Sequence, residues 1–335
     1  MTCQDRDTSI SPCKHYVRGG FCRLPYQFRC LEYLAKHEMS LSYSNMQSFI
    51  QCRRAFYYGS IAGIQLKPEY QNIRMLMGQI WSEVCDEVHK QNEGGNIKDG
   101  VMALFAKYTD QLVAASEEPE DIPLELAKMQ TLAEWYMGSA WAEAKGSVQH
   151  GFKWQEPDYP EIYGLLDLLM PWSIYDMKYS KHPQLYGSKF IIEDQSAIYF
   201  LGTPGVERIT FRAFRVPGLR TRKDESIEEY KDRLLKDIER QPGHYLEEYS
   251  YWRSEFDLER VKNRAKRVAL ELGTTMNAFT ADRDLEVFWQ DKHACYGSLQ
   301  QDSPAPCQYL PLCETYTTKL LGSAIYETQY VKRQL

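Results

Sequence analysis

Two aspartates and a lysine lie in two short apolar segments that the sequence predicts to be paired strands. Asp167 interrupts the segment 162–170, Asp176 interrupts the segment 173–179, and Lys178 follows two residues after Asp176. Side chains two apart in a strand share one face, so Asp176 and Lys178 point to the same side of the sheet. If the strands pair through the short turn between them, Asp167 approaches that side too.

This combination of residues suits phosphodiester hydrolysis with a divalent metal. A charged side chain in a half-buried strand is costly unless it is paired or bound to a cation. Carboxylates hold Mg²⁺ or Mn²⁺, and the bound cation polarises a phosphate and lowers the pKa of a water. A nearby lysine orients that water or neutralises developing charge. The pattern favours Asp167 and Asp176 as metal ligands and Lys178 as a catalytic residue, although an ion pair on an edge hairpin accounts for the same residues.

A glutamine and a tyrosine follow on the next predicted helix, over 193–201. Gln195 and Tyr199 are four residues apart, so they share one helix face. An amide and a phenol on one face can order a water or hold a phosphate, and we take both as candidate catalytic residues. The alternative is a polar helix surface without a catalytic role.

A basic segment comes directly after these residues. Between positions 208 and 223 there are six basic residues and no acidic one. A solvated face often explains such a run, but its position after the carboxylates makes phosphate contact at least as good an explanation. The candidate DNA-binding residues are Arg208, Arg212, Arg215, Arg220, Arg222 and Lys223.

Seven of the nine cysteines crowd toward the two ends of the chain, while Cys52 and Cys85 stand alone. In a reducing compartment, clustered cysteines favour metal binding over disulfides. The basic and aromatic N-terminal segment suggests a small zinc-binding element that suits single-strand binding, where bases stack on rings and phosphates meet cations. Ordinary thiols are the alternative. The candidate zinc ligands are Cys3, Cys13, Cys22 and Cys30.

The composition limits the class of protein. The chain has 335 residues, a hydrophobic fraction of 43% and a net charge of −6. These values exclude a disordered or fibrous protein and a globally basic one, so nucleic-acid contact depends on a local patch. We find no apolar run long enough to cross a membrane and no secretory signal, and we therefore expect a cytoplasmic protein without a membrane partner.

The elements that must position these residues are helices on either side of a small sheet. We expect a Cys-rich element over 1–40 and an α/β domain over 41–335, with a further strand at about 207–216. The predicted helices begin at Ser42 or Ser44 and at Ser226, and extend over about 74–91, 100–115, 124–146, 193–201 and 256–273.

The order of the motifs resembles the RecB-like branch of the PD-(D/E)xK nuclease superfamily, over about residues 41–316. Within that branch the chain is similar to the iron–sulphur members, which are the AddB-type helicase-nucleases, the CRISPR-associated adaptation exonucleases and their phage-borne relatives. The segments that carry the resemblance are Gly164-x-x-Asp167, Asp176-x-Lys178, Gln195-x-x-x-Tyr199, the early Phe49-x-x-Cys52-Arg-Arg-x-Phe56, and the late cysteines Cys295, Cys307 and Cys313.

The resemblance implies a restriction-endonuclease-like core sheet flanked by helices. It implies a metal-dependent deoxyribonuclease that acts as an exonuclease on single-stranded DNA ends. The processes implied are recombination, end processing or spacer capture, with recombination or CRISPR-type protein partners. It also implies a [4Fe–4S] cluster held by Cys52, Cys295, Cys307 and Cys313, although zinc would use the same four ligands.

One position departs from the family pattern. Members commonly carry a histidine in a Gly-x-x-x-His element as an additional metal ligand, whereas Gly78 is followed here by Ser82. Glu83 or Glu87 is a possible substitute, and we take Glu83 as the candidate ligand. The rival interpretation is a catalytically weak or inactive nuclease-fold adaptor that binds DNA.

Overall fold

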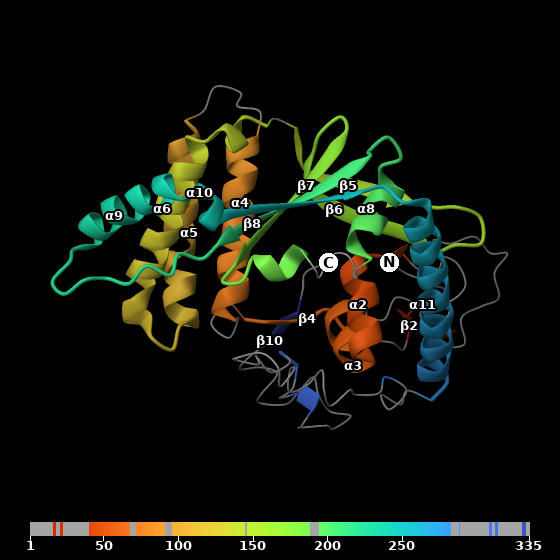
Figure 1. Ribbon diagram of the computed structural model, residues 1–335. Coiled ribbons are helices and arrows are strands. Elements are labelled where there is room, and N and C mark those ends of the chain that lie inside the picture. The colour runs from red at the N-terminus through yellow and green to blue at the C-terminus, as the bar shows by residue number, and fades with distance from the viewer. Residues whose placement is uncertain are drawn as a thin grey trace. The chain divides into compact units, whose positions relative to one another are not determined.

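The computed structural model divides into two compact units, which are described separately (Figure 1). One unit comprises residues 1–66, 155–162 and 262–335, and the other comprises residues 67–154 and 163–261. The structure describes residues 16–17, 21–22, 40–67, 72–90, 96–144, 146–187, 194–282, 288, 308–309, 312–313 and 330–332. Most of the predicted Cys-rich element, 1–40, therefore lies outside the described residues.

The unit of residues 67–154 and 163–261 contains a sheet and most of the helices. Its strands are β5 (Ser147–Trp154), β6 (Glu161–Leu169, whose first two residues belong to the other unit), β7 (Ser173–Ser180), β8 (Arg208–Arg215) and β9 (Leu246–Trp252). Its helices are α4 (Ile73–His89), α5 (Ile97–Ala115), α6 (Ile122–Met137), α8 (Gln195–Gly202), α9 (Ile227–Arg240) and α10 (Pro242–Tyr245), with single 3₁₀ turns at Pro119–Asp121 and Ala140–Glu143.

The sheet is mixed and helices flank it, which confirms the predicted α/β class. β7 pairs in parallel with β8, whereas β6 pairs antiparallel with β7 and β8 pairs antiparallel with β9. In this register Asp176 stands opposite Phe211, in the middle of the parallel pair. The two strands predicted over 162–170 and 173–179 are therefore confirmed as β6 and β7.

Helices α4, α5, α6 and α9 cover one face of this sheet and are neighbours in that order (Figure 1). Their core includes Met177 of β7 and Phe214 of β8. The indole of Trp81 on α4 is fully buried, with its ring centroid 4.6 Å from that of Phe214. Because side chains alternate along a strand, Asp176 and Lys178 point to the opposite face, which α8 covers.

Most predicted helices are present, and the differences have local causes. Ser226 begins α9 with a capping box, in which its hydroxyl accepts from the Glu229 N–H and the Glu229 carboxylate accepts from the Ser226 N–H. α6 ends at Met137 rather than near 146, because Gly138 follows as a helix terminator. Strands β5 and β9 were not predicted from the sequence.

The other unit carries shorter elements and the end of a long helix. The Ser42 hydroxyl caps α2 by accepting from the Asn45 N–H at 3.1 Å, which confirms one of the two predicted starts. No helix among the described residues is apolar over the length that a bilayer requires. The elements are β1 (Tyr16–Val17), β2 (Phe21–Cys22), β3 (Ser40–Leu41), α2 (Tyr43–Gln51), α3 (Arg53–Phe56), a π-helical turn (Tyr57–Ile61), β4 (Ile64–Leu66), β10 (Tyr330–Lys332) and α11 (Glu255–Asp282), whose first turns belong to the other unit.

Candidate active site

Asp176 and Lys178 form an ion pair at the centre of β7. Asp176 is 1% exposed, and its Oδ2 lies 2.5 Å from Nζ of Lys178. Burial lowers the pKa of Lys178, but the negative charges of Asp176 and Asp167 outweigh burial and hold that pKa above its ordinary value. The lysine is therefore a protonated hydrogen-bond donor at neutral pH in the metal-free protein.

Asp167 joins this pair from β6. Its Oδ2 accepts the backbone N–H of Met177 at 2.7 Å, so the carboxylate reaches across to β7 between the two residues of the ion pair. Burial, followed by the negative charge of Asp176, raises the pKa of Asp167 to about 7, against the opposing effect of Lys178. Two carboxylates thus meet with one lysine between them, which is the arrangement predicted for the hairpin.

Helix α8 contributes two hydrogen bonds to the Asp176 carboxylate. Oδ1 of Asp176 accepts from Tyr199 Oη at 3.3 Å and from Gln195 Nε2 at 3.4 Å, and Gln195 Nε2 also donates to Tyr199 Oη at 2.7 Å. Burial and the charges of Asp176 and Asp167 raise the pKa of Tyr199 well above its ordinary value, so the phenol stays protonated. All five residues predicted to be catalytic therefore lie together.

We expect Asp167→Asn to stabilise the metal-free protein at pH 8. The folded-state pKa of about 7 lies above the unfolded value, so the stabilising contribution of the bound proton is complete below about pH 4 and is lost as the pH rises through 7. Asparagine removes the buried charge and keeps an oxygen for the Met177 N–H. Urea unfolding in EDTA should show a gain of about 1–3 kcal/mol at pH 8 that declines toward pH 4. A gain that does not change with pH would contradict the raised pKa.

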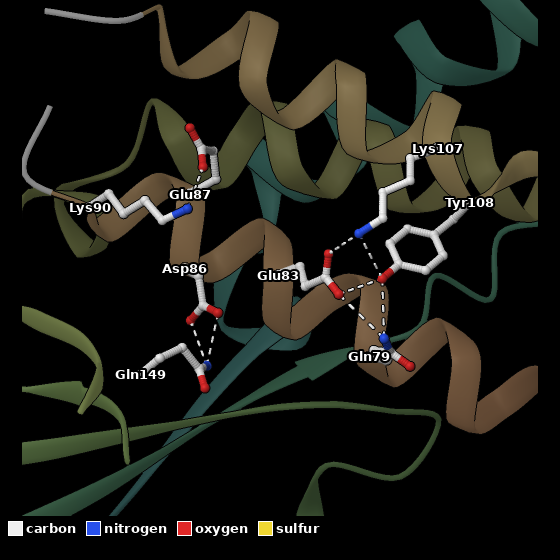
Figure 2. A network of polar contacts seen from close by, with 8 residues as sticks. All are labelled: Gln79, Glu83, Asp86, Glu87, Lys90, Lys107, Tyr108 and Gln149. Carbon is white, nitrogen blue, oxygen red and sulfur yellow. Dashed lines mark hydrogen bonds and ion pairs between the residues drawn. The ribbon is translucent and has the colours of Figure 1, made fainter. Parts of the chain in front are cut away.

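Two acidic residues of α4, Glu83 and Asp86, point to different neighbouring elements (Figure 2). Glu83, the predicted additional metal ligand, turns to α5, where its carboxylate accepts from Tyr108 Oη and, at 3.1 Å, from Lys107 Nζ. Asp86, one turn later, turns to β5, where Nε2 of Gln149 donates to both of its oxygens at 3.0 and 2.8 Å. Glu83 is thus engaged with α5 and is not among the residues that the structure groups around Asp176.

Asp86 and Gln149 were not singled out from the sequence. The negative charge of Asp86 contributes to the raised pKa of Asp167. Asp86 is therefore the α4 carboxylate whose charge affects the site. Gln149 has a φ of 48°, a left-handed conformation that few non-glycine residues adopt and that often marks a functional position. The spacing from Gly78 through Ser82 to Asp86 repeats every four residues and is the signal that would have placed Asp86 on that helix face.

The six basic residues of 208–223 separate into two groups. Arg212 is 4% exposed, and its guanidinium donates to Glu248, to Tyr136 Oη and to the Trp141 carbonyl. The Arg212 side chain is therefore not accessible for a contact with DNA, contrary to the prediction. Arg208 is half-buried, and Arg215 is paired with Glu247 at 2.8 Å. The other three, Arg220, Arg222 and Lys223, are exposed to solvent.

Only part of the predicted cysteine ligands can be located. Cys52 and Cys313, both in the unit that contains α2, are buried. Cys52 stands in an extended conformation between α2 and α3, so it interrupts what would otherwise be one helix. Cys22 lies in β2. Cys295, Cys307, Cys3, Cys13 and Cys30 lie outside the described residues.

The carboxylate pair fits a hard divalent cation. Oδ2 of Asp176 is buried and contacts the Lys178 ammonium. Carboxylate oxygens are the ligands that Mg²⁺ and Mn²⁺ prefer. Within the described residues, no three His, Cys, Asp or Glu side chains come close enough together to hold a metal ion. Asp167 and Asp176 would therefore share the cation with water or substrate oxygens.

One family of known proteins matches this chain. The model of the PD-(D/E)XK nuclease superfamily matches residues 40–203, a range that contains all five residues grouped around Asp176. This part of the chain is therefore similar to that superfamily. No curated protein sequence matches the chain.

Proposed function

Since residues 40–203 match the model of the PD-(D/E)XK nuclease superfamily, we propose that the protein is a divalent-metal-dependent deoxyribonuclease. The observation that carries the proposal is the pair of aspartates, with Lys178 at 2.5 Å from the buried Asp176 and the Met177 N–H bound to the partly buried Asp167. An aspartate whose pKa is raised to about 7, beside a second aspartate and a lysine, points to a functional site.

We assign a role to each member of the site. Asp167 and Asp176 hold Mg²⁺ or Mn²⁺, which when bound polarises the phosphate and lowers the pKa of the attacking water. Lys178 donates to that water or to the negative charge that develops on the phosphate. Gln195 and Tyr199 fix the orientation of the Asp176 carboxylate through their hydrogen bonds to Oδ1, and Tyr199 stays a donor because its pKa is raised.

The proposed substrate is DNA with a single-stranded end, cleaved by an exonuclease mechanism. Support comes from the resemblance of the motifs and from three cations, Arg220, Arg222 and Lys223, that are exposed to solvent. Such exposed cations bind phosphates without reading sequence. Such an activity is used in recombination, end processing and spacer capture, together with the protein partners of those pathways.

The activity and its polarity are tested together by a choice of substrates. We expect a 5′- or 3′-labelled linear single strand to be shortened in Mn²⁺ or Mg²⁺, while a circular single strand of the same sequence stays intact. A linear RNA of that sequence and a blunt duplex measure the preference for DNA and for single strands. Cleavage of the circle would show an endonuclease, and no cleavage of any substrate would contradict the proposal.

A DNA-binding adaptor without catalysis is the second candidate. The observation in its favour is Ser82 on α4, where the superfamily pattern has a metal-binding histidine. Such a protein would bind the linear single strand with equal affinity in metal and in EDTA, and would leave it intact.

We also propose a [4Fe–4S] cluster held by Cys52, Cys295, Cys307 and Cys313. The buried thiols of Cys52 and Cys313, and the interruption of the helix at Cys52, support this assignment. A second, zinc-binding site at Cys3, Cys13, Cys22 and Cys30 is proposed from the sequence alone.

Replacing Cys52 or Cys313 by serine should remove most of the iron. We expect the iron and acid-labile sulfide of anaerobically purified protein to fall below about a quarter of the wild-type content, because cluster assembly needs all four thiolates. Cys85→Ser is the matched control, since Cys85 is buried on α4 beside Trp81 and should keep its iron. Zinc without iron in the wild-type protein would contradict the cluster and show a zinc site instead.

A further inference from the structure

A segment directly after β7 folds back over the face of the sheet that holds the carboxylates. β7 ends at Ser180, and residues 181–187, here called the return segment, follow it with one helical turn at 184–187. The return segment belongs to the same compact unit as the sheet. Its first residue, Lys181, comes three residues after Lys178, so the segment begins beside the ion pair of Asp176 and Lys178.

The strand register shows on which face the segment lies. Asp176 of β7 stands opposite Phe211 of β8, and Phe211 stands opposite Tyr249 of β9. Residues that stand opposite each other share a face of the sheet, and so do residues two or four apart in one strand. Arg215, four residues after Phe211, and Tyr251, two residues after Tyr249, therefore point to the face of Asp176.

Arg215 holds the beginning of the return segment. Its guanidinium donates to the Lys181 carbonyl and to Oε1 of Gln184, both at 3.4 Å. The same guanidinium donates to the His244 carbonyl and to Oε1 of Glu247, both at 2.8 Å, which fix its position. Arg215 thus joins the return segment to α10 and β9, two elements that are distant from it in the sequence.

Tyr251 holds the other end of the return segment. Its hydroxyl donates to the Gly187 carbonyl. Gly187 also packs closely on β9, because a Cβ at this position would lie 2.6 Å from Cε1 of Tyr249, so only glycine permits the approach. In the register of the sheet Tyr249 is level with Asp176. The return segment therefore runs from the end of β7 back to the level of Asp176.

The return segment acts on Lys178 through Tyr186. Burial lowers the pKa of Lys178, whereas the charges of Asp176 and Asp167, and to a smaller extent that of Tyr186, raise it. The Lys178 side chain is 26% exposed, so most of its surface is covered. Because both ends of the return segment are fixed, Tyr186 stays close to the lysine.

We propose that Arg215 and Tyr251 are positioning residues, which hold the return segment beside Lys178 and so keep the ammonium directed at the carboxylate site. This inference rests on the proposed nuclease function, in which Lys178 donates to the attacking water or to the phosphate. A displaced segment leaves Lys178 free to turn to solvent, and a misplacement of about 1 Å can cost about a hundredfold in rate. The sequence predicted a DNA contact for Arg215, and the two roles predict different results.

The first test measures the rate of reductive methylation of Lys178 by mass spectrometry in EDTA, so that neither metal nor cleavage plays a part. Tyr251→Phe keeps the ring and removes the hydroxyl that binds Gly187. Loss of this hydrogen bond should increase the detached population of the return segment, and with it the methylation of Lys178, about tenfold. The exposed Lys223 is the internal reference and should react at the wild-type rate.

Tyr245→Phe is the matched control for Tyr251→Phe. It removes a phenol hydroxyl whose hydrogen bond, at 2.7 Å, goes to Asp237 of α9. A loss of stability alone would therefore affect both variants alike. We expect Tyr245→Phe to leave the methylation of Lys178 unchanged, and an increase as large as that in Tyr251→Phe would overturn the proposal.

The second test separates positioning from DNA contact at Arg215. In Mn²⁺, Arg215→Met should lower the maximal single-turnover rate on a labelled single strand about a hundredfold, while the affinity for labelled oligothymidine in EDTA stays within about twofold of wild type. Arg215→Lys keeps a donor at this place and should recover part of the rate. Weaker binding of the oligothymidine with an unchanged maximal rate would show a DNA contact and overturn the positioning role.

The methylation of Lys178 separates this proposal from the proposed function. If the wild type cleaves DNA but Lys178 reacts at the wild-type rate in both Arg215→Met and Tyr251→Phe, the positioning role is wrong while the nuclease stands. If the wild type cleaves nothing but the methylation rises in both variants, the return segment holds Lys178 as proposed and the nuclease fails. Should Arg215→Met not fold, Tyr251→Phe decides the outcome in both tests.

Discussion

Asp176→Asn should reduce the cleavage of single-stranded DNA at least about a thousandfold. The substitution keeps the shape of the side chain and removes a negative charge from the centre of the site, where Asp176 is 1% exposed and adjoins Lys178. Loss of a charged metal ligand costs several kcal/mol of transition-state stabilisation, which corresponds to a factor of this size. Single-turnover rates on an end-labelled strand in Mn²⁺ and in Mg²⁺ measure it.

Two controls make the Asp176→Asn result specific. Asp110→Asn changes an exposed aspartate of α5 in the same way and should leave the rate unchanged. The iron content and the urea midpoint of Asp176→Asn should show that the variant is folded. A wild-type cleavage rate in this variant would overturn the assignment of the site.

Arg212→Met should destabilise the fold by about 3 kcal/mol, the second of the two largest effects we expect. The guanidinium donates to Glu248 at 2.6 Å and to the Trp141 carbonyl at 2.9 Å, and it lies over the ring of Tyr175 at 4.2 Å. Removing the guanidinium takes a donor from the buried Tyr136 hydroxyl and from the Trp141 carbonyl, and leaves the exposed Glu248 carboxylate without its ion pair. Urea unfolding at neutral pH measures the loss.

Arg220→Met is the matched control for Arg212→Met. Arg220 is exposed, and surface substitutions of this kind change stability by less than about 0.5 kcal/mol. An Arg212→Met protein that is as stable as wild type but binds DNA more weakly would contradict the buried position of Arg212, and would favour the phosphate contact expected from the sequence.

The carboxylate site was predictable because its parts are close in the chain. Alternation alone puts Asp176 and Lys178 on one face, and a hairpin brings Asp167 to them. Helical periodicity put Gln195 and Tyr199 on one face in the same way. Each of these inferences used a spacing of two to four residues or one short turn, so none required knowledge of the tertiary packing.

The remaining errors concern contacts between elements that are distant in the sequence. Arg212 was taken for a DNA contact because β9, which supplies Glu248, was not predicted, so no partner for the guanidinium was visible. On α4, Glu83 and Glu87 were the candidates from the sequence, and Asp86 was not singled out. The packing of α5 against Glu83 and of β5 against Asp86 does not follow from helical periodicity.

The most direct measurement is the shortening of end-labelled single-stranded DNA by anaerobically purified protein in Mn²⁺, Mg²⁺ or EDTA. We predict cleavage with either metal, none in EDTA, and loss of cleavage in Lys178→Ala, whose side chain adjoins Asp176. The position of the label then gives the polarity. DNA that is bound but not cleaved under any metal would contradict the nuclease and favour the adaptor.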